Sequence, residues 1–335
     1  MKILIATGIY PPDIGGPAQY AQNTETEFKK MGHEVRLLTF RFERKLPTGV
    51  RHLWFFFRVL FSLRGVDMVF VLDTFSAALP AVLASRLFGT KALLRTGGDF
   101  LWENYVERTG DMVLFKDFYA TRMRKLNLKE RMIFRMTRWI LHSCDAVIFS
   151  TVWQRDIFTP AYKLDSGKNR IVENFYGPKI KSYEPTEKLF IAGTRPLKWK
   201  NIARLKEAFA QDTIRRSTLV FDDRTIPHSR FIERIQHCYA VVLVSLGDIS
   251  PNTILDAVRA DKPFILTREC GLYEKLKDTG LFVDPENVTD IAEKLHTLAD
   301  PSHYSYWKHK VESFTFTHTW EEICREILVI HTSLL

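Results

Sequence analysis

The sequence predicts an α/β protein built from two doubly wound parallel sheets. Short apolar, β-prone runs alternate with helix-like segments over most of the 335 residues, a pattern typical of βαβ units. At this length, and with 46% hydrophobic residues, the chain can bury two cores of ordinary size. The stretch Tyr176–Pro185 is rich in turn-forming residues and separates two sets of strands, so we expect one domain over residues 1–174 and a second over 175–315.

Each set supplies enough strands for a sheet of its own. In the first half the expected strands are Lys2–Thr7, Val35–Thr39, Met68–Leu72, Ala92–Arg95 and Ala146–Ser150. In the second half they are Leu189–Ala192, Thr218–Phe221, Ala240–Ser245, Pro263–Thr267 and Leu281–Val283. The GxGxxG fingerprint of dinucleotide-binding folds is absent from both halves, which disfavours a nicotinamide or flavin enzyme.

The turn after the first strand, "GIYPPDIGGPAQY" (residues 8–20), is the first candidate for a binding site. Gly15 and Gly16 precede a helix with Pro17 at its first position. A strand, a glycine turn and a helix N-terminus together place backbone N–H groups at the carboxyl edge of a sheet, where they can bind an anion. An ordinary tight turn would use the same residues, so both interpretations stay open.

Charge is distributed unevenly along the chain. Residues 1–175 contain 26 Lys/Arg against 17 Asp/Glu, whereas the remainder contains 22 of each, so the net charge of +9 resides in the first half. This asymmetry predicts a polyanionic partner for that half: an anionic membrane, a nucleic acid or a phosphorylated substrate. The four cysteines are scattered without a CxxC pair, which favours a reducing compartment and predicts neither a disulfide framework nor a zinc site.

Two segments, 41–64 and 121–140, combine the basic excess with aromatic or apolar residues. They either lie on an anionic bilayer or are core helices with solvated basic faces. No recognised DNA- or RNA-binding motif accompanies them, so no nucleic-acid partner is expected. The start of the chain does not resemble a signal peptide, and its apolar runs are too short or too interrupted to span a bilayer. We therefore expect a cytoplasmic protein, peripheral on the inner face of the membrane if it binds lipid.

The stretch "SLGDISPNTILDAVRADKPFI" (residues 245–265) is the most informative in the second half. It follows an expected strand, and Ser250-Pro251 is typical of a helix N-cap and a first helical residue. The backbone N–H groups of Asn252 and Thr253 would then have no partner within the helix. An anion bound there would meet these donors and the positive end of the helix dipole together.

Two acids and two cations border the same expected sheet edge. Asp256 would lie one turn further along the helix and Asp248 in the loop ahead of the cap. They are either ligands for sugar hydroxyls or ordinary surface acids. Arg195 and Lys200 follow the first strand of the second half, where two cations can neutralise a diphosphate. Ordinary surface basicity is the alternative for this pair.

Taken together, these residues resemble the family 4 retaining glycosyltransferases of the GT-B fold, nearly end to end. That family has a glycine-rich first loop, an arginine and a lysine five apart after the first strand of the second domain, and two acids with seven residues between them. The matching residues here are Gly15, Gly16, Arg195, Lys200, Asp248 and Asp256. The resemblance implies two Rossmann-like domains facing a cleft, with a C-terminal helix, residues 316–335, that returns to the first domain.

The resemblance also implies roles for these residues. Asp256 would bind the donor ribose and Asp248 the donor sugar. The donor diphosphate would be bound by Gly15, Gly16, Arg195, Lys200, Asn252 and Thr253. The implied reaction is hexosyl transfer with retention from a nucleotide diphosphate sugar to a polysaccharide or lipid-linked acceptor. It would need no metal or other cofactor, because fixed cations and helix dipoles can stabilise the departing diphosphate. The expected product is a cell-surface polysaccharide or glycolipid.

Three departures from the family pattern bear on catalysis. The family's paired acids are usually glutamates, and aspartate is one methylene shorter. The histidine that the family often has in its first domain corresponds here to Thr96 or Gly97, which leaves Asp99 as the expected substitute and second catalytic candidate. Thr194 displaces the glycine that usually precedes the arginine.

Other functions are compatible with the same sequence. A GT-B-like nucleotide-sugar epimerase, a donor-binding pseudoenzyme and, less well supported, a basic nucleic-acid-binding α/β protein are the alternatives. The run "FDDR" (residues 221–224) is similar to the metal-binding acid motif of the other major glycosyltransferase fold, but nothing around it supports a metal. The ten histidines include no pair at metal-ligand spacing on an evident helix.

Overall fold

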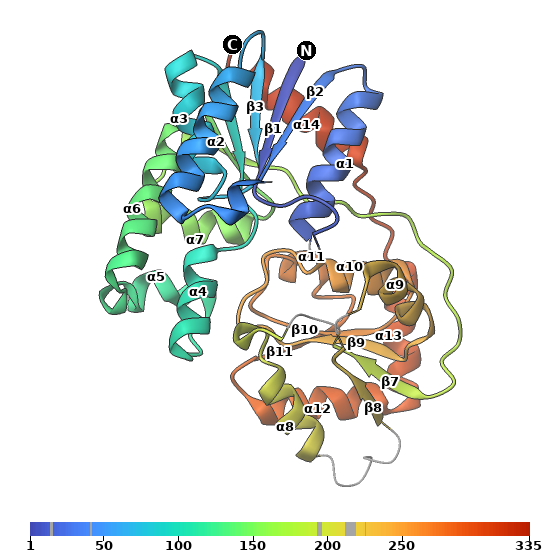
Figure 1. The fold of residues 1–335 in the computed structure, drawn as a ribbon. Helices are drawn as coiled ribbons and strands as arrows, with labels where there is room; N and C mark the ends of the chain where they lie inside the picture. The colour runs from blue at the N-terminus through green and yellow to red at the C-terminus, as the bar shows by residue number, and fades with distance from the viewer. Residues whose placement is uncertain (14–15, 41, 193–195, 212–218, 225) are drawn as a thin grey trace. The chain divides into compact units, whose positions relative to one another are not determined.

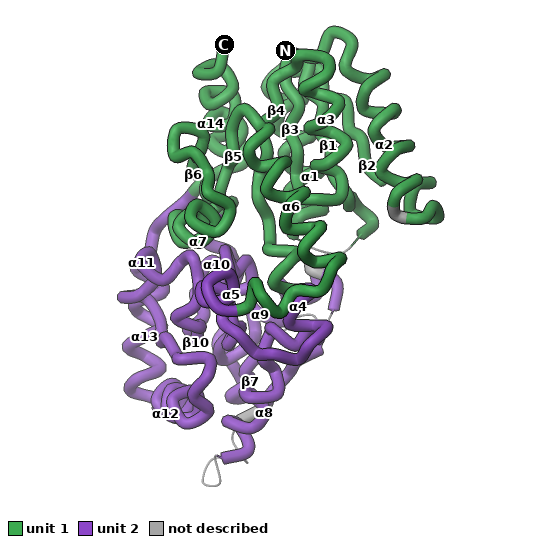
Figure 2. Tube along the Cα trace, turned by 90° about the vertical axis from the view of Figure 1, so that its left-hand side faces the viewer, with its two compact units in different colours: residues 1–103, 122–175, 318–335 green, residues 104–121, 176–317 purple. Residues whose placement is uncertain are grey.

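A computed structural model describes the chain except residues 14–15, 41, 193–195, 212–218 and 225 (Figure 1). Its contacts divide the chain into two compact units (Figure 2). Unit 1 contains residues 1–103, 122–175 and 318–335, and unit 2 contains residues 104–121 and 176–317.

The segment 104–121 corrects the expected domain boundaries. The sequence predicts this segment in the first domain, yet it packs within unit 2. The reason is a set of hydrogen bonds that no local pattern reveals. The backbone N–H of Phe115 donates to the carbonyl of Leu246 (3.1 Å), and Lys116 Nζ donates to Glu269 Oε1 (2.5 Å).

Unit 1 is built on a parallel sheet whose strand order, in the described residues, is β2-β1-β3-β4-β5-β6. The strands are β1 (Lys2–Thr7), β2 (Glu34–Thr39), β3 (Met68–Val71), β4 (Lys91–Arg95), β5 (Ala146–Phe149) and β6 (Asn169–Ile171). The first five lie within one residue of their expected positions. The edge strand β6 was not expected, because its three residues are only partly buried and form no apolar run.

Helices cover both faces of this sheet. Helices α1 (Gly16–Lys30) and α14 (Trp320–Thr332) pack together on one face. Helices α2 (Thr48–Ser62), α3 (Ala78–Phe88) and α6 (Leu128–Ser143) lie side by side on the other (Figure 1). The remaining helical elements of unit 1 are η1 (Phe42–Lys45), η2 (Met123–Lys125), α7 (Val152–Tyr162) and η3 (Ser166–Lys168), and α4 (Phe100–Thr109) runs across the boundary between the units.

Unit 2 contains the second parallel sheet, in the order β11-β10-β9-β7-β8 among the described residues. Its strands are β7 (Lys188–Ile191), β8 (Leu219–Asp222), β9 (Ala240–Leu243), β10 (Phe264–Thr267) and β11 (Leu281–Val283). Each overlaps an expected strand. The largest difference is at β9, which ends two residues earlier than expected, at Leu243.

Both faces of this second sheet are buried, as a parallel sheet requires. In β9, Val241 and Leu243 face a core that contains residues of α9 (His228–His237) and α10 (Asn252–Arg259). Val242 faces the opposite core, with residues of α8 (Ile202–Gln211) and α12 (Val288–Ala299). The other helical elements are α5 (Phe115–Thr121), η4 (Lys198–Lys200), α11 (Tyr273–Leu276) and α13 (Pro301–Ser313). The prediction of two doubly wound α/β sheets is confirmed.

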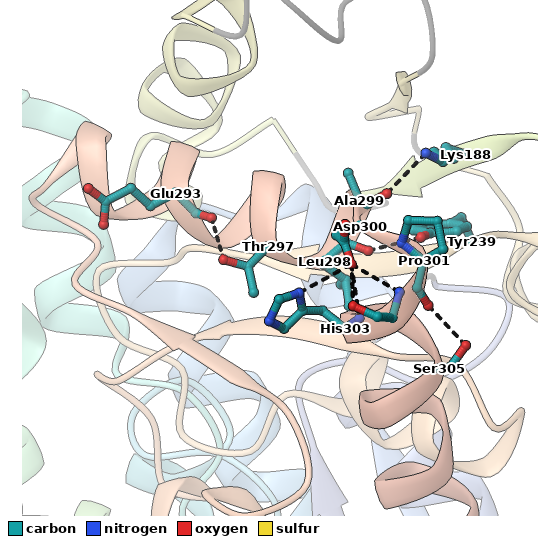
Figure 3. A network of polar contacts seen from close by, with 11 residues as sticks. Lys188, Tyr239, Glu293, Thr297, Leu298, Ala299, Asp300, Pro301, His303 and Ser305 are labelled. Atoms are coloured by element: carbon teal, nitrogen blue, oxygen red, sulfur yellow. Dashed lines mark hydrogen bonds and ion pairs between the residues drawn. The ribbon is translucent and has the colours of Figure 1, made fainter.

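The junction of α12 and α13 secures the amino-terminal edge of the unit 2 sheet (Figure 3). Asp300 Oδ1 accepts from the backbone N–H groups of Ser302 (3.0 Å) and His303 (3.3 Å), so it caps α13. Lys188 Nζ and the Tyr239 hydroxyl donate to the last carbonyls of α12 (3.0 and 2.9 Å). These two residues sit at the start of β7 and directly before β9, so their bonds join the amino ends of both strands to the end of α12. Among the described residues, no helix combines the length and apolarity needed to cross a membrane.

Candidate active site

The strand order of unit 2 reverses at β7, which pairs with β8 on one side and with β9 on the other. In open α/β sheets, ligands bind beyond the carboxyl ends of the strands at such a switch point. Lys200 lies in η4, after β7, and Asp248 in the loop after β9. The second-half residues singled out from the sequence therefore fall at the edge where this fold binds ligands.

Lys200 and Asp248 form the centre of this site. Lys200 Nζ lies 2.6 Å from Asp248 Oδ2, and the two side chains are only 13% and 12% exposed. The Ser245 hydroxyl donates to the same Asp248 oxygen at 3.3 Å. Lys200 Nζ also lies 4.2 Å from the centre of the Trp199 ring. The structure thus holds an ammonium group and a carboxylate together in a position that is largely shielded from solvent.

Asn201 fixes the loop that carries Lys200. It ends η4 in the left-handed region (φ 61°), a conformation that asparagine tolerates better than most residues. Its side-chain Nδ2 donates to the carbonyls of Val244 (3.0 Å) and Pro285 (2.7 Å), which follow β9 and β11. Three loops at the carboxyl edge of the sheet are therefore joined by one buried amide.

Helix α10 begins one residue later than the sequence analysis expected. Pro251 is its N-cap, with an extended ψ of 90°, so Ser250 does not cap it and Pro251 is not the first helical residue. The backbone N–H groups of Ile254 and Leu255 both donate to the Pro251 carbonyl. The Asn252 and Thr253 amides come before these first helical bonds, as the anion-site prediction requires.

Asp256 lies deeper than its neighbours at the start of α10. It is buried, at 8% exposed, whereas Asn252 is exposed and Thr253 half-buried. Its Oδ1 lies 3.2 Å from Arg259 Nη1, one turn further along the helix. The expected position one turn from the helix start is correct, but the carboxylate is paired and does not project freely from the surface.

Two residues that support this edge were not predicted from the sequence. Glu269 follows β10, is buried, and its carbonyl accepts from the Asp248 backbone N–H at 2.9 Å. Burial raises the pKa of the Glu269 carboxyl, against the lowering effect of Lys116 at 2.5 Å. Glu269 lies two residues after an expected strand, and this position at the sheet edge is the signal that could have indicated it. Nothing in the sequence indicated Lys116, which comes from the distant segment 104–121.

In unit 1, Gly16 is the first residue of α1, and this helix has no acid in its first turn to offset its dipole. The loop before it is held by Asp13, whose Oδ1 accepts from Arg44 Nη1 at 2.8 Å. The hydrogen bond from Arg44 lowers the pKa of Asp13 to about 2. Gly15, and Arg195 in unit 2, lie outside the described residues.

Asp99 is placed as a helix cap in unit 1. It is 3% exposed, and its Oδ1 accepts from the backbone N–H of Trp102 at 2.9 Å, at the start of α4. Thr96, where the family often has a histidine, is buried, and its hydroxyl lies within hydrogen-bond distance of the Ile148 carbonyl and Gln154 Oε1. The structure therefore gives Asp99 and Thr96 clear structural partners.

The acids of the "FDDR" run have partners of their own. Asp222 forms ion pairs with Arg224, at 3.0 Å, and with Arg234. Lys206 Nζ lies 2.7 Å from Asp223 Oδ2. Within the described part of the chain, no three His, Cys, Asp or Glu side chains are grouped as metal ligands.

Part of the chain matches the model of a known protein family. Residues 167–300 match the family model described as glycosyl transferases group 1, a span that includes Lys200, Asp248 and Asp256. The resemblance to glycosyl transferases that the motifs indicated is confirmed at the level of group 1 over these residues, while assignment to family 4 and a retaining mechanism stay predictions. No curated protein matches the chain significantly.

Solved glycosyltransferase structures share the fold over almost the whole chain. Sucrose-phosphate synthase from Thermosynechococcus elongatus is 14% identical with a TM-score of 0.71, over 99% of this chain and 98% of that one. WaaG, a glycosyltransferase involved in lipopolysaccharide biosynthesis, is 13% identical with a TM-score of 0.66, over 99% and 100%. HepE of Anabaena, in complex with UDP and glucose, is 11% identical with a TM-score of 0.63, over 99% and 97%. Residues 167–300 thus form a group 1 glycosyl transferase region in a chain with the GT-B fold.

Proposed function

We propose that this glycosyltransferase moves a hexosyl group, with retention, from a nucleotide diphosphate sugar to a polysaccharide or lipid-linked acceptor, without a metal or other cofactor. The observation that carries the proposal is the Lys200–Asp248 pair at the switch point of unit 2, next in sequence to the N-terminus of α10. It combines a cation and backbone N–H donors for a diphosphate with a carboxylate for sugar hydroxyls.

Donor binding would use the three hydrogens of the Lys200 ammonium. One is directed to Asp248, which leaves donors for a phosphate oxygen. The Asn252 and Thr253 amides would bind the diphosphate together with Gly15, Gly16 and Arg195, and Asp256 would bind the ribose. The UDP and glucose in the HepE complex support a donor of this chemical class.

Catalysis would rest on the electrostatics of the same groups. As the bond between the sugar and the diphosphate breaks, negative charge develops on the leaving group, where a fixed cation and a helix N-terminus stabilise it without reorganisation. Asp248 would orient the donor sugar. Asp99 is the proposed second catalytic group, and its bond to Trp102 would hold the carboxylate in one orientation.

The acceptor would be reached at the cytoplasmic face of a membrane. Unit 1 carries the segments 41–64 and 121–140, in which Arg and Lys alternate with aromatic and apolar residues. An anionic bilayer would attract this unit and concentrate a lipid-linked acceptor near it. The expected product is a cell-surface polysaccharide or glycolipid.

A thermal-shift panel tests the donor site. Uridine, guanosine and adenosine diphosphates and their sugar conjugates would be added to the wild type and to the Lys200→Ala and Asp256→Asn variants. Lys206→Ala and Asp278→Asn are matched controls, because both are exposed residues of the same types in unit 2. We expect one nucleotide series to stabilise the wild type and both controls but neither site variant. Equal shifts in all five proteins, or none in the wild type, would place the donor elsewhere.

Product analysis tests the transfer step. With the donor series identified, nuclear magnetic resonance of the product would show whether the anomeric configuration is retained, and transfer should persist in the presence of a chelator. An altered nucleotide sugar in the absence of any acceptor would identify an epimerase instead. Donor binding without turnover on lipid and soluble acceptors would indicate a pseudoenzyme.

A further inference from the structure

Helix α2 presents an apolar stripe to the surface of unit 1. Val50, Leu53, Trp54, Phe57 and Phe61 follow helical spacing along one side of the helix, and they are between 44% and 80% exposed. The opposite side of the helix buries Phe55 and Val59 in the unit. A surface helix normally has polar residues on its outer side, so an apolar outer stripe indicates a partner.

The neighbouring helix extends this apolar surface. Helices α2 and α3 pack along each other on the same face of the sheet (Figure 1). From α3, Leu83, Leu87 and Phe88 are 39%, 68% and 51% exposed. Soluble monomers rarely expose so many large apolar side chains in one layer.

Helix α6, which packs against α3, adds positive charge to the same layer. Its exposed side carries Lys129, Arg131, Arg135 and Arg138. Three exposed apolar residues accompany them: Leu128, Met132 and Trp139. The sequences of α2, α3 and α6 contain a single acid, Glu130, and it is buried in the capping box at the start of α6. This surface is therefore apolar at α2 and α3 and basic at α6.

We propose that the exposed residues of α2, α3 and α6, here called the lipid face, dock on an anionic bilayer. The aromatic stripe of α2 enters the boundary between headgroups and acyl chains, as interfacial amphipathic helices do. The arginines of α6 lie at the level of the anionic headgroups and supply the charge complementarity. The proposal rests on the membrane contact of the proposed function and assigns the residues that make it. It can fail without the donor site failing, because the lipid face belongs to unit 1 alone and contains none of the proposed donor-site residues.

The choice of a bilayer over a protein partner rests on charge and composition. A second copy of this chain would bring the same basic α6 surface against itself, which like-charge repulsion opposes. An acidic protein would satisfy the arginines but would not by itself explain an apolar stripe that continues over two helices. An anionic leaflet provides negative charge and an apolar interior side by side.

Sedimentation with vesicles tests the proposal on the intact chain. The vesicles consist of phosphatidylcholine alone or mixed with phosphatidylglycerol. One variant combines Trp54→Ser, Phe57→Ser and Phe61→Ser, and the other combines Arg131→Gln, Arg135→Gln and Arg138→Gln. Val329→Ser and Arg325→Gln serve as controls, because both residues are exposed on α14, away from the lipid face. Circular dichroism would show that all variants fold.

We expect the wild type and the controls to bind anionic vesicles at least about tenfold more strongly than neutral ones. The arginine variant should lose this preference for anionic lipid, and the aromatic variant should lose binding to both kinds of vesicle. Unchanged nucleotide-induced thermal shifts in both variants would separate this result from a failure of the donor site.

Three outcomes would overturn the proposal. The first is a wild type that binds neither kind of vesicle. The second is a wild-type dimer, detected by light scattering without lipid, that becomes monomeric in the aromatic variant, because the occupant of the face would then be a second copy. The third is equal vesicle binding by the wild type and both triple variants, which would place the contact on another surface.

Discussion

Lys200 has a single positive charge and two anionic partners to satisfy: the Asp248 carboxylate at 2.6 Å and the diphosphate that it is proposed to bind. With both side chains only slightly exposed, the pair is shielded from solvent, and a ligand phosphate would have to share the ammonium with Asp248. Because of this competition, a substitution of Asp248 alone should affect nucleotide binding and sugar transfer differently.

Asp248→Asn is expected to separate them. The amide removes the negative charge that competes for Lys200, so nucleotide diphosphate affinity should stay equal or rise a few-fold, whereas turnover should fall because the sugar loses its carboxylate partner. Calorimetric titration gives the affinity, and initial transfer rates give the turnover. If Asp248→Asn weakens nucleotide binding as much as Lys200→Ala does, the pair serves to shape the loop rather than to divide binding from catalysis.

Two substitutions of Asp99 can distinguish its role as a helix cap from its proposed role in catalysis. Asparagine can also cap a helix, so Asp99→Asn should keep the melting temperature, whereas Asp99→Ala should cost about 0.5–2 kcal/mol of stability. If Asp99 is the second catalytic group, the asparagine variant also loses transfer activity while remaining folded. Wild-type rates in Asp99→Asn would leave Asp99 as a cap of α4 only.

At the scale of elements, the segment 104–121 couples the chain's first half to the candidate site. Phe115 and Leu246 are joined by a backbone hydrogen bond, and Leu246 is joined in turn to the carbonyl of Trp199, directly before Lys200. Lys116 holds Glu269, whose carbonyl accepts from the Asp248 backbone N–H. Both loops of the site are therefore supported by two residues, Phe115 and Lys116, that precede Lys200 by more than eighty positions in the sequence.

Lys116→Ala should destabilise unit 2 by about 1–3 kcal/mol, because Glu269 would keep a buried, unsatisfied carboxylate. The loss should depend on pH. Burial already raises the pKa of Glu269, and removing the lysine raises it further, so the folded state of the variant prefers the protonated acid. Stability relative to the wild type should therefore be nearly preserved below the ordinary glutamate range and should decrease as the pH rises through and above it.

Melting temperatures of the wild type and Lys116→Ala at about pH 4 and pH 7 test whether the loss of stability grows with pH. Lys277→Ala is the matched control, since Lys277 is as exposed as Lys116 (47% against 46%) but pairs with Glu274, which is 81% exposed. It should change little at either pH. A loss in Lys116→Ala that is larger at low pH would contradict the assignment.

At the scale of the whole molecule, each unit is completed by chain from outside its main span. Unit 2 takes in the segment 104–121, and unit 1 takes in α14 from the far end of the sequence. Ile323, Ile327 and Ile330 of α14 join the core that contains Phe28 of α1 and Ile5 of β1. The core of unit 1 therefore depends on side chains of α14.

Ile327→Ala should destabilise unit 1 by about 2–5 kcal/mol, because it opens a cavity in a fully buried part of this core. Hydrogen exchange would localise the effect, with amides of β1 and β3 losing protection while those of β9 and β10 keep it. Val329→Ala, on the exposed side of the same helix (68%), should have no comparable effect. Equal loss of protection in both sheets would show that the units unfold together.

Most of the fold could be predicted from the sequence, because strands that are buried on both faces consist of unbroken runs of apolar residues. Ten of the strands in the described residues overlap expected ones, and β6 was missed because "NRI" carries no such run. The site was accessible for a related reason: Lys200 and Asp248 lie in the segments that follow two strands ending at one edge of a parallel sheet. Their ion pair is a matter of side-chain geometry, which spacing cannot supply.

The sequence alone determined two doubly wound sheets, the basic first half and the residues that follow the strands at the carboxyl edge of the second sheet. These follow from local hydrophobic patterns and from where strands end, so neighbouring residues suffice to define them. The tertiary structure decided what depends on contacts distant in sequence: the place of 104–121 in unit 2, the burial of Glu269 against Lys116, the cap made by Asp99, and the outward side of α2. The sequence of an apolar helix is the same whether its apolar stripe packs in a core or faces solvent. Only the packing of the helix against other elements distinguishes these two arrangements.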